Sequence, residues 1–480
     1  MNLSLLSLTL CFSTLLFISP IDAREKMPKA MLQNATKDRF IDIISTHMPK
    51  VRIHTLGATD YDPQQMHLAL TTDPTALSIS WVTGKVVQDP TVYYWPGQHT
   101  PQPSNASTTT GLTSTYTAGD FGWTGSIYNA EMTNLIPGQF YSYTVGSPSV
   151  NVWSDPVSFK TPVAPGATAN LKLAITADQG TIVPLGYAIS EAIIQEHFET
   201  GHPFDACLIS GDISYATIDP PNHEIEWTWD SYMIQVEPYA AVIPFMATVG
   251  NHEATPGNKT NATGTYNDIW GAAFQSRFFM PANGNGNLWF SFNIGPVHVA
   301  SISSEHNYTI GSEQWLWLQN DLQSVDRSVT PWVFVSLHRP IYSSDEDEYG
   351  SHCPGGVFAV NLEPLLVQNK VDLVLQGHEH CAERTQAHIN GTVITAAVNQ
   401  GNGTASNTYV NPGAPIYIVQ GSSGAVQEES WVTPQPVWSA FRIEDVYGYG
   451  IMEITGANLL EYYFVDTQRQ IWDQWRIVRQ

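Results

Sequence analysis

Five apolar segments between residues 170 and 380 each run into polar residues of a kind that binds metal ions. LAITA leads to Asp178, CLIS to Gly211-Asp212-x-x-Tyr215, MATV to Gly250-Asn251-His252-Glu253, VFVSL to His338, and LVLQ to Gly377-His378-Glu379-His380. A glycine at each of three of these ends lets the backbone turn sharply there. Because ligands of open α/β sheets bind beyond the carboxyl ends of the strands, we expect the five loops to converge.

The residue types at these ends suit two hard or borderline cations. Carboxylate oxygens and imidazole nitrogens are ligands for such ions, and one aspartate can bridge two ions about 3.5–4 Å apart. A single strand-end histidine or Gly-Asp pair is usually structural, but five such segments in this order indicate a dinuclear site. Tyr215 is then either a packing aromatic or a metal ligand.

The periodicity around these segments predicts an N-terminal all-β sandwich followed by an α/β domain. Residues 60–163 alternate apolar and polar positions between frequent turns, and SISWV with LxPGxxYxYxV suggests a fibronectin-III-like module. From 168 to 415, buried strands alternate with helical spacing at 186–199, 223–238, 312–325 and 359–368. Residues 416–480 return to strand-like patterns, and we expect them to complete the α/β domain, which contains two sheets with metals at the strand ends.

The N-terminus predicts export. Residues 1–23 have an apolar stretch too short to span a membrane, followed by small and polar residues, as in a cleaved signal peptide. Residues 24–59 follow as an N-terminal segment without an assigned domain. Beyond residues 1–23, seven Asn-x-Ser/Thr sequons support export and predict a glycoprotein: Asn34, Asn105, Asn258, Asn261, Asn307, Asn390 and Asn402. We expect a secreted protein, with the cell wall or the vacuole also compatible.

Charge and cysteine content narrow the partners. The formal net charge of −24 argues against nucleic acid and against an anionic membrane surface, and no later stretch is apolar enough to span a bilayer. An anionic substrate would therefore need a local cation. Cys207 is expected to be buried, while Cys353 and Cys381 are either free or joined in a disulfide.

The series D-x-G, GDxxY, GNHE, VxxH and GHxH resembles the motif set of the metallophosphoesterases. GDxxY after a fibronectin-like domain is similar to the plant-type purple acid phosphatases, across nearly all of the expected mature chain. The resemblance implies an acid phosphatase that cleaves small phosphomonoesters by attack of a metal-bound hydroxide. The implied Fe(III) ligands are Asp178, Asp212, Tyr215 and His380. A divalent ion, Zn, Fe or Mn, would take Asn251, His338, His378 and the same Asp212.

The resemblance also implies roles for residues beside the metals. His252 would contact the substrate phosphate or protonate the leaving group, and Glu253 and Arg384 would support the ligands. The loop after His338 departs from the family pattern, so His352 is a catalytic candidate of uncertain alignment. The acidic run 345–348 in that loop is either a solvated loop, a source of a general acid, or a repulsive element against highly anionic substrates. Cys381 and Ala382 alter the wall beside His380.

Two other functions fit the same sequence. The altered walls would suit a metallo-phosphodiesterase or nucleotide pyrophosphatase of the same superfamily. A non-catalytic adhesion or binding glycoprotein built on a former enzyme is the second alternative, although all seven ligand positions hold residues able to bind metal. A homodimer remains open.

Overall fold

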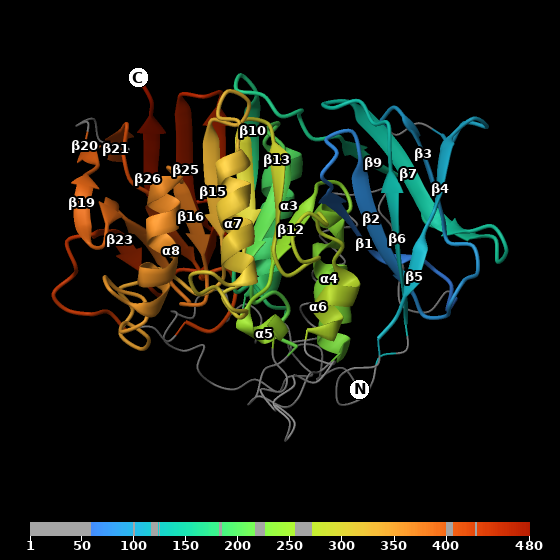
Figure 1. The fold of residues 1–480 in the computed structure, drawn as a ribbon. Coiled ribbons are helices and arrows are strands. Elements are labelled where there is room, and N and C mark those ends of the chain that lie inside the picture. The colour runs from blue at the N-terminus through green and yellow to red at the C-terminus, as the bar shows by residue number, and fades with distance from the viewer. Residues whose placement is uncertain are drawn as a thin grey trace, which may run out of the picture.

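The computed structural model describes residues 59–98, 101–116, 123, 125–181, 185–216, 226–254, 271–399, 407–427 and 430–480. The predicted signal peptide, nearly all of segment 24–59 and four of the sequons, at Asn34, Asn258, Asn261 and Asn402, lie outside these residues. Figure 1 shows a β-sandwich at one end of the molecule and a larger α/β domain at the other.

The N-terminal domain is a sandwich of two sheets. One sheet has the order β1 (Gln64–Leu70), β2 (Leu77–Thr83), β6 (Ser126–Met132), β5 (Leu112–Ser114). The other contains β4 (Ser107–Thr110), β3 (Thr91–Pro96), β7 (Phe140–Ser147) and β8 (Val152–Trp153), with β9 (Val157–Lys160) also paired to β7. Inward-facing Trp81, Val92 and Tyr143 are fully buried between the sheets, as strand alternation requires. The predicted all-β sandwich is confirmed.

The larger domain contains two mixed sheets. The eight-stranded sheet runs β12 (Phe245–Thr248), β11 (Ala206–Ser210), β10 (Asn170–Thr176), β24 (Gly448–Thr455), β25 (Leu459–Asp466), β26 (Ile471–Val478), β21 (Asn407–Val410), β20 (Val398–Asn399). The seven-stranded sheet runs β13 (Phe290–Ile294), β14 (Val297–Ser301), β15 (Trp332–Ser336), β16 (Leu373–Gln376), β22 (Ile416–Gln420), β17 (Ala382–Thr385), β23 (Ser439–Ile443). A two-stranded ribbon, β18 (Ala387–Ile389) with β19 (Thr392–Thr395), stands apart.

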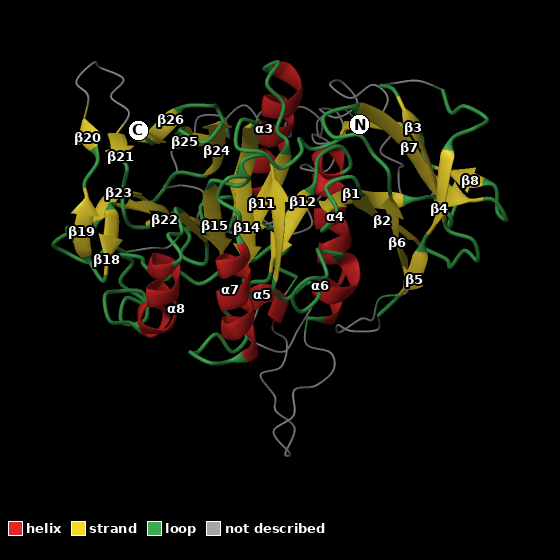
Figure 2. Cartoon of the chain, turned by 45° about the horizontal axis from the view of Figure 1, so that its top comes forward, coloured by secondary structure: helices red, strands yellow, loops and turns green. Residues whose placement is uncertain are grey.

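Helices pack on the outer faces of both sheets. α7 (Glu313–Ser324) and α8 (Val357–Gln368) cover the seven-stranded sheet, and α3 (Gly186–Glu199) packs on the eight-stranded sheet beside α4 (Glu226–Ala240). The short helices are α5 (Asn251–Ala254), which follows β12 at the strand ends, and α6 (Ala272–Arg277). Alternate residues of β15 divide between two cores: Phe334 packs between the sheets, and Val335 packs with Leu318 of α7 and Leu362 of α8. Both views show α7 and α8 side by side (Figures 1 and 2). The predicted fold class is therefore confirmed.

Strand direction places the site. β10, β11 and β12 are parallel neighbours in one sheet, and β14, β15, β16 and β22 are parallel neighbours in the other. The C-terminal strands join the same framework, because β24 pairs antiparallel with β10. Hydroxyl groups near the strand ends connect the two sheets: Ser336 Oγ lies 3.0 Å from both Ser210 Oγ and Thr248 Oγ1. Consequently, the carboxyl ends of five strands from two sheets lie together.

A seam joins the sandwich to the α/β domain. Arg277 is 1% exposed and its guanidinium donates to Tyr116 Oη and Gln65 Oε1, both at 2.8 Å, and to Asp230 Oδ1 at 2.9 Å. The same guanidinium lies over the ring of Trp123, 4.7 Å from its centroid. This network fixes the two domains against each other.

The structure also bears on the predictions about a disulfide, about exposed glycosylation sequons and about membrane spans. Cys353 and Cys381 are not joined in a disulfide, and Cys207 is buried as expected. The three sequon asparagines within the described residues, Asn105, Asn307 and Asn390, are exposed. None of the described helices is long and apolar enough to cross a membrane.

Candidate metal centre

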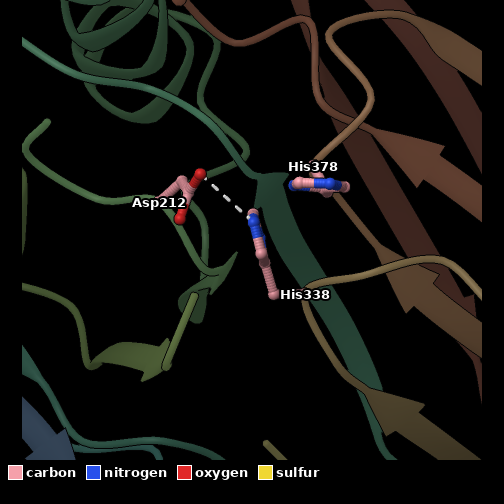
Figure 3. Close-up of side chains that lie close together, drawn as sticks. All are labelled: Asp212, His338 and His378. Atoms are coloured by element: carbon pink, nitrogen blue, oxygen red, sulfur yellow. Dashed lines mark ion pairs between the residues drawn. The ribbon is translucent and has the colours of Figure 1, made fainter. Parts of the chain in front are cut away.

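The predicted ligands meet where the five strands end. Asp178 follows β10, Asp212 follows β11, Asn251 begins α5 after β12, and His338 and His378 each lie two residues beyond β15 and β16. Figure 3 shows Asp212 on one side, with His338 and His378 coming from the facing sheet. The ligand atoms of these three residues all lie within 4.8 Å of one another.

One group of ligand atoms surrounds His338. Its Nε2 lies 3.2 Å from Asp212 Oδ2 and 2.9 Å from Asn251 Oδ1. The His338 and His378 rings have centroids 5.1 Å apart and are nearly perpendicular. The other imidazole nitrogen, His338 Nδ1, contacts the Ser210 carbonyl at 2.9 Å. This contact directs Nε2 toward the carboxylate and amide oxygens, the orientation that metal-binding histidines adopt.

A second group forms around Asp178. The Tyr215 hydroxyl donates to Asp178 Oδ1 at 3.1 Å and lies 2.8 Å from His380 Nε2. His380 Nε2 is 3.6 Å from the same carboxylate oxygen, and His380 Nδ1 is held by the Val426 carbonyl at 2.6 Å. Tyr215 therefore faces the site and is not a simple packing residue.

The backbone at these positions is constrained. Asp178, Asp212, Tyr215 and His378 have φ values of 56°, 49°, 54° and 73°. Residues other than glycine rarely adopt this left-handed backbone conformation, because it is strained. Where they do, they are often found at functional sites. A Cβ atom at Gly377 would lie 2.5 Å from Asp178 Oδ2, and one at Gly250 would collide with Asp212. Glycine is therefore required for the close approach of both carboxylates.

Burial disfavours negative charge on the acidic groups of the centre. Burial raises the pKa of Asp178 well above its usual value, and the Asp212 charge raises it further. Burial also favours a higher pKa for Asp212, but the charges of His338 and His252 outweigh it and lower the pKa. Burial raises the Tyr215 pKa strongly, and both carboxylates add to that rise. Cations between these groups would reverse these penalties, so the donor set fits two metal ions.

His252 and Glu253 lie beside the ligands. The His252 amide donates to Asp212 Oδ1 at 2.9 Å, its ring centroid is 4.4 Å from that of Tyr215, and its side chain is 26% exposed. It therefore borders both the site and solvent. Glu253 accepts hydrogen bonds from the amides of Asp212, Ile213 and Gly250 at 2.8–2.9 Å. Glu253 thus holds the turn that carries Asp212.

His352 is fully buried next to His378. Its Nδ1 contacts the Pro340 carbonyl at 2.5 Å, and its Nε2 is 3.2 Å from Glu348 Oε2. The His352 ring stacks on Phe358, with its centroid 6.3 Å from that of His378. A buried ring with both nitrogens engaged has no face open to a substrate. The position favours support over the direct catalytic role that the sequence suggested.

Arg384 requires a correction. It lies on β17, and its guanidinium donates to both carboxylate oxygens of Asp473, at 2.8 and 3.0 Å, and to the Tyr409 hydroxyl. Among the described residues, none of its recorded hydrogen bonds reaches a predicted ligand. Arg384 therefore ties β17 to β26, and the predicted support of the metals is wrong, because β17 leads away from the strand ends.

Two residues near the centre were not predicted individually. Arg339 follows His338 directly, and its Nη1 lies 2.8 Å from His378 Nε2. Glu348 belongs to the acidic run, and its Oε2 is 3.0 Å from Arg339 Nη1 and 3.7 Å from His378 Nε2. The run is not uniform, since Asp345 is buried while Glu346 and Asp347 are exposed. Adjacency to a predicted ligand was the one sequence signal for Arg339.

Two facing sheets with carboxylate, amide and imidazole groups at the strand ends define a metallophosphoesterase. The family descriptions that match are "Purple acid Phosphatase, N-terminal domain" at 63–161, "Calcineurin-like phosphoesterase" at 171–382 and "Iron/zinc purple acid phosphatase-like protein C" at 414–474. The chain belongs to the purple acid phosphatase family, as its motifs predicted.

Individual relatives agree with this assignment. Acid phosphatase type 7 of Danio rerio is 31% identical over 74% of this chain and 78% of that protein. The "Fe(3+)-Zn(2+) purple acid phosphatase 12" of Arabidopsis thaliana is 30% identical over 84% of this chain and 80% of that protein. A purple acid phosphatase from yellow lupin seeds shares the fold, with a TM-score of 0.74 at 24% identity over 87% of this chain and 75% of that chain. The predicted enzyme class is confirmed at the level of the family.

Proposed function

We propose that the protein is a secreted acid phosphatase that hydrolyses small phosphomonoesters at a centre of Fe(III) and a divalent ion. The observation that carries the proposal is the convergence of all seven predicted ligands in two groups at the strand ends. Asp178, Tyr215 and His380 would hold Fe(III), and Asp212 would bridge the two ions. The second ion would be Zn, Fe or Mn; the Arabidopsis relative is named for Fe(3+) and Zn(2+).

The residues around the ligands suit phosphate ester cleavage. When bound, the ions would offset the charge of the phosphoryl group and activate the attacking water. His252 is placed at the solvent-facing edge, where its imidazole would hold the substrate phosphate or give a proton to the leaving alcohol. Glu253 would keep Asp212 in position through three amide hydrogen bonds. Thus a chain with a net charge of −24 would bind an anion by local positive charge.

A visible absorption spectrum with metal analysis tests the centre. An Fe(III) ion bound to the Tyr215 phenolate would give a charge-transfer band, and Tyr215→Phe should remove that band while the fold is retained. Tyr143→Phe is the matched control, because Tyr143 also donates one buried hydrogen bond, at 2.9 Å, but from the sandwich to the Ala241 carbonyl just after α4. If iron-loaded, oxidised wild-type protein showed no visible charge-transfer band, the Fe(III) assignment would be wrong.

Substrate class and export need separate tests. Rates on a generic aryl phosphomonoester and on the matching diester at acid pH separate a phosphatase from a phosphodiesterase, and faster cleavage of the diester would favour the latter. Export rests on residues 1–23 and on the sequons, three of which present exposed asparagines. We expect the mature protein to begin near residue 24. Its apparent mass on denaturing gels should fall after glycosidase treatment. Retention of residues 1–23 in the purified protein would contradict export by a cleaved signal.

A further inference from the structure

Next to the centre, a guanidinium N–H group of Arg339 faces an imidazole nitrogen of the predicted ligand His378. Arg339 Nη1 and His378 Nε2 lie 2.8 Å apart. A guanidinium nitrogen can only donate, so His378 Nε2 must accept in this arrangement. His378 therefore carries its proton on Nδ1. The arginine is the cation that faces this predicted ligand.

Two carboxylates also bind Arg339. Its Nε donates to Glu305 Oε1 at 3.0 Å, and its Nη1 donates to Glu348 Oε2 at 3.0 Å. Its Nη2 donates to none of the residues that the structure describes, and the side chain is 23% exposed. Arg339 is thus tethered at one end of its fork and keeps a donor for another partner.

The same corner has the spacing of a third cation site, but the arginine fills it. Ligand atoms of Glu348, His352 and His378 lie within 4.8 Å of one another. Arg339 Nη1 is already within 3.0 Å of Glu348 Oε2 and 2.8 Å of His378 Nε2. A metal ion there would face the guanidinium charge at short range. The corner is therefore better described as an arginine site.

A metal ion on His378 is incompatible with the present contact of Arg339. If the ion binds Nε2, the guanidinium nitrogen must leave that position. If the ion binds Nδ1, the remaining ring proton moves to Nε2, and two donors would then face each other. Glu348, whose carboxylate is already near, can accept from Nε2 in that case. Either way, loading of the predicted ligand releases Arg339 Nη1 from His378, so that one of its two N–H groups is free for another acceptor while the other can stay on Glu348.

We propose that Arg339, released from His378 when the centre is loaded, binds a second anionic group on the substrate. The inference rests on the proposed phosphatase function and deepens it. Glu305 would keep the guanidinium at the edge of the site, and Nη1 and Nη2 would form the planar pair that recognises a carboxylate or phosphate. The favoured substrates are phosphomonoesters whose alcohol carries an anionic group a few atoms from the ester oxygen.

Paired substrates test the recognition step on the metal-loaded, full-length protein. Ethyl phosphate and 2-phosphoglycolate differ in a methyl group against a carboxylate. We expect wild-type protein to prefer phosphoglycolate in kcat/KM, and Arg339→Gln to lower that preference by about 10–100-fold, the usual effect of losing a charged hydrogen-bonded pair. Arg339→Lys keeps the charge without the fork and should fall between them. An unchanged preference in Arg339→Gln, or no preference in wild type, overturns the proposal.

Metal affinity tests the release step without catalysis. Removing a cation that competes for His378 should tighten binding of Zn(II), the probe, in Arg339→Gln, whereas Glu348→Gln should weaken it by about 10-fold or more. Opposite signs separate this mechanism from general damage, which would weaken both. Asp347→Asn is the control, because it removes one charge from an exposed neighbour. Equal or weaker Zn(II) affinity in Arg339→Gln overturns the release step.

The two arms separate this inference from the proposed function. Wild-type, metal-loaded protein that cleaves neither substrate would contradict the phosphatase assignment itself. Cleavage of both without selectivity would contradict only the role of Arg339.

Discussion

The strand-end centre and the domain seam both bury charge, but they balance it differently. At the seam, Arg277 is surrounded by the partners that it needs, namely Asp230, Gln65 and Tyr116. At the centre, the carboxylates of Asp178 and Asp212 and the Tyr215 hydroxyl share one buried space. There the Asp212 charge adds to the rise that burial causes in the pKa of Asp178, and both carboxylates raise the pKa of Tyr215.

The difference separates a structural cluster from a binding site. A buried guanidinium with an anionic partner and further hydrogen-bond acceptors from the same chain holds two parts of that chain together. Buried acidic groups gathered at a strained backbone need a partner from outside the chain, and perturbed pKa values of this kind mark functional sites. Balance of charge within the chain is therefore more informative than burial alone.

Loss of the bridging carboxylate should have the largest effect on activity. Asp212→Asn should lower hydrolysis of an aryl phosphate by about 10³-fold or more, because two-ion stabilisation contributes several kcal/mol to the reaction. His338→Ala should act in the same direction, and both variants should lose bound metal by elemental analysis. Asp230→Asn at the seam is the matched control and should retain metal. Activity that survived both centre variants would show that the site assignment is wrong.

Loss of the seam arginine should instead affect stability. Arg277→Ala should lower the free energy of unfolding by about 2–4 kcal/mol, because it leaves a cavity and removes the partner of the Asp230 carboxylate, whose side chain is 33% exposed. Arg277→Met refills the volume and should cost less. Urea titrations measure both effects. We expect bound metal and the rate per folded molecule to persist, so a loss of metal with unchanged stability would break the distinction between the two regions.

Sequence reasoning located the centre because each ligand follows a recognisable strand. The residues of α3 and the strands before Asp178, Asp212 and His338 lie where periodicity placed them. Local sequence patterns were enough to locate the ligands, because each loop directly follows its own strand and parallel strands bring the loops together.

Contacts between distant segments were not predictable in this way. Arg339 meets Glu305, which lies in a loop without any motif, and Arg277 meets residues from three separate segments whose docking no local pattern specifies. Arg384 shows the converse error. It stands four residues after His380, yet β17 directs it to Asp473 on β26. Nearness in sequence therefore failed where the chain reverses direction.

The smallest expected effect concerns pH at the seam. Glu237 of α4 is partly buried and accepts a hydrogen bond from the Gln65 amide at 3.1 Å. Burial raises the pKa of Glu237 from 4.5 to about 7. The folded state thus favours the neutral acid, and this stabilisation is complete below pH 4.5 and lost as pH rises through about 7. The loss should be about 2 kcal/mol, given partial burial.

Glu237→Gln isolates this contribution, because the amide imitates the neutral acid. Buried His67 works in the opposite sense: burial lowers its pKa from 6.5 to about 4, so its stabilisation is present above pH 6.5 and lost as pH falls through about 4. Wild type and variant both contain His67, so its contribution cancels when the unfolding midpoint of the wild type is subtracted from that of the variant at each pH. The difference should grow in favour of the variant as pH rises toward 7. A difference independent of pH would mean that Glu237 stays ionised in the folded protein, and the seam would then hold an unbalanced charge as the centre does.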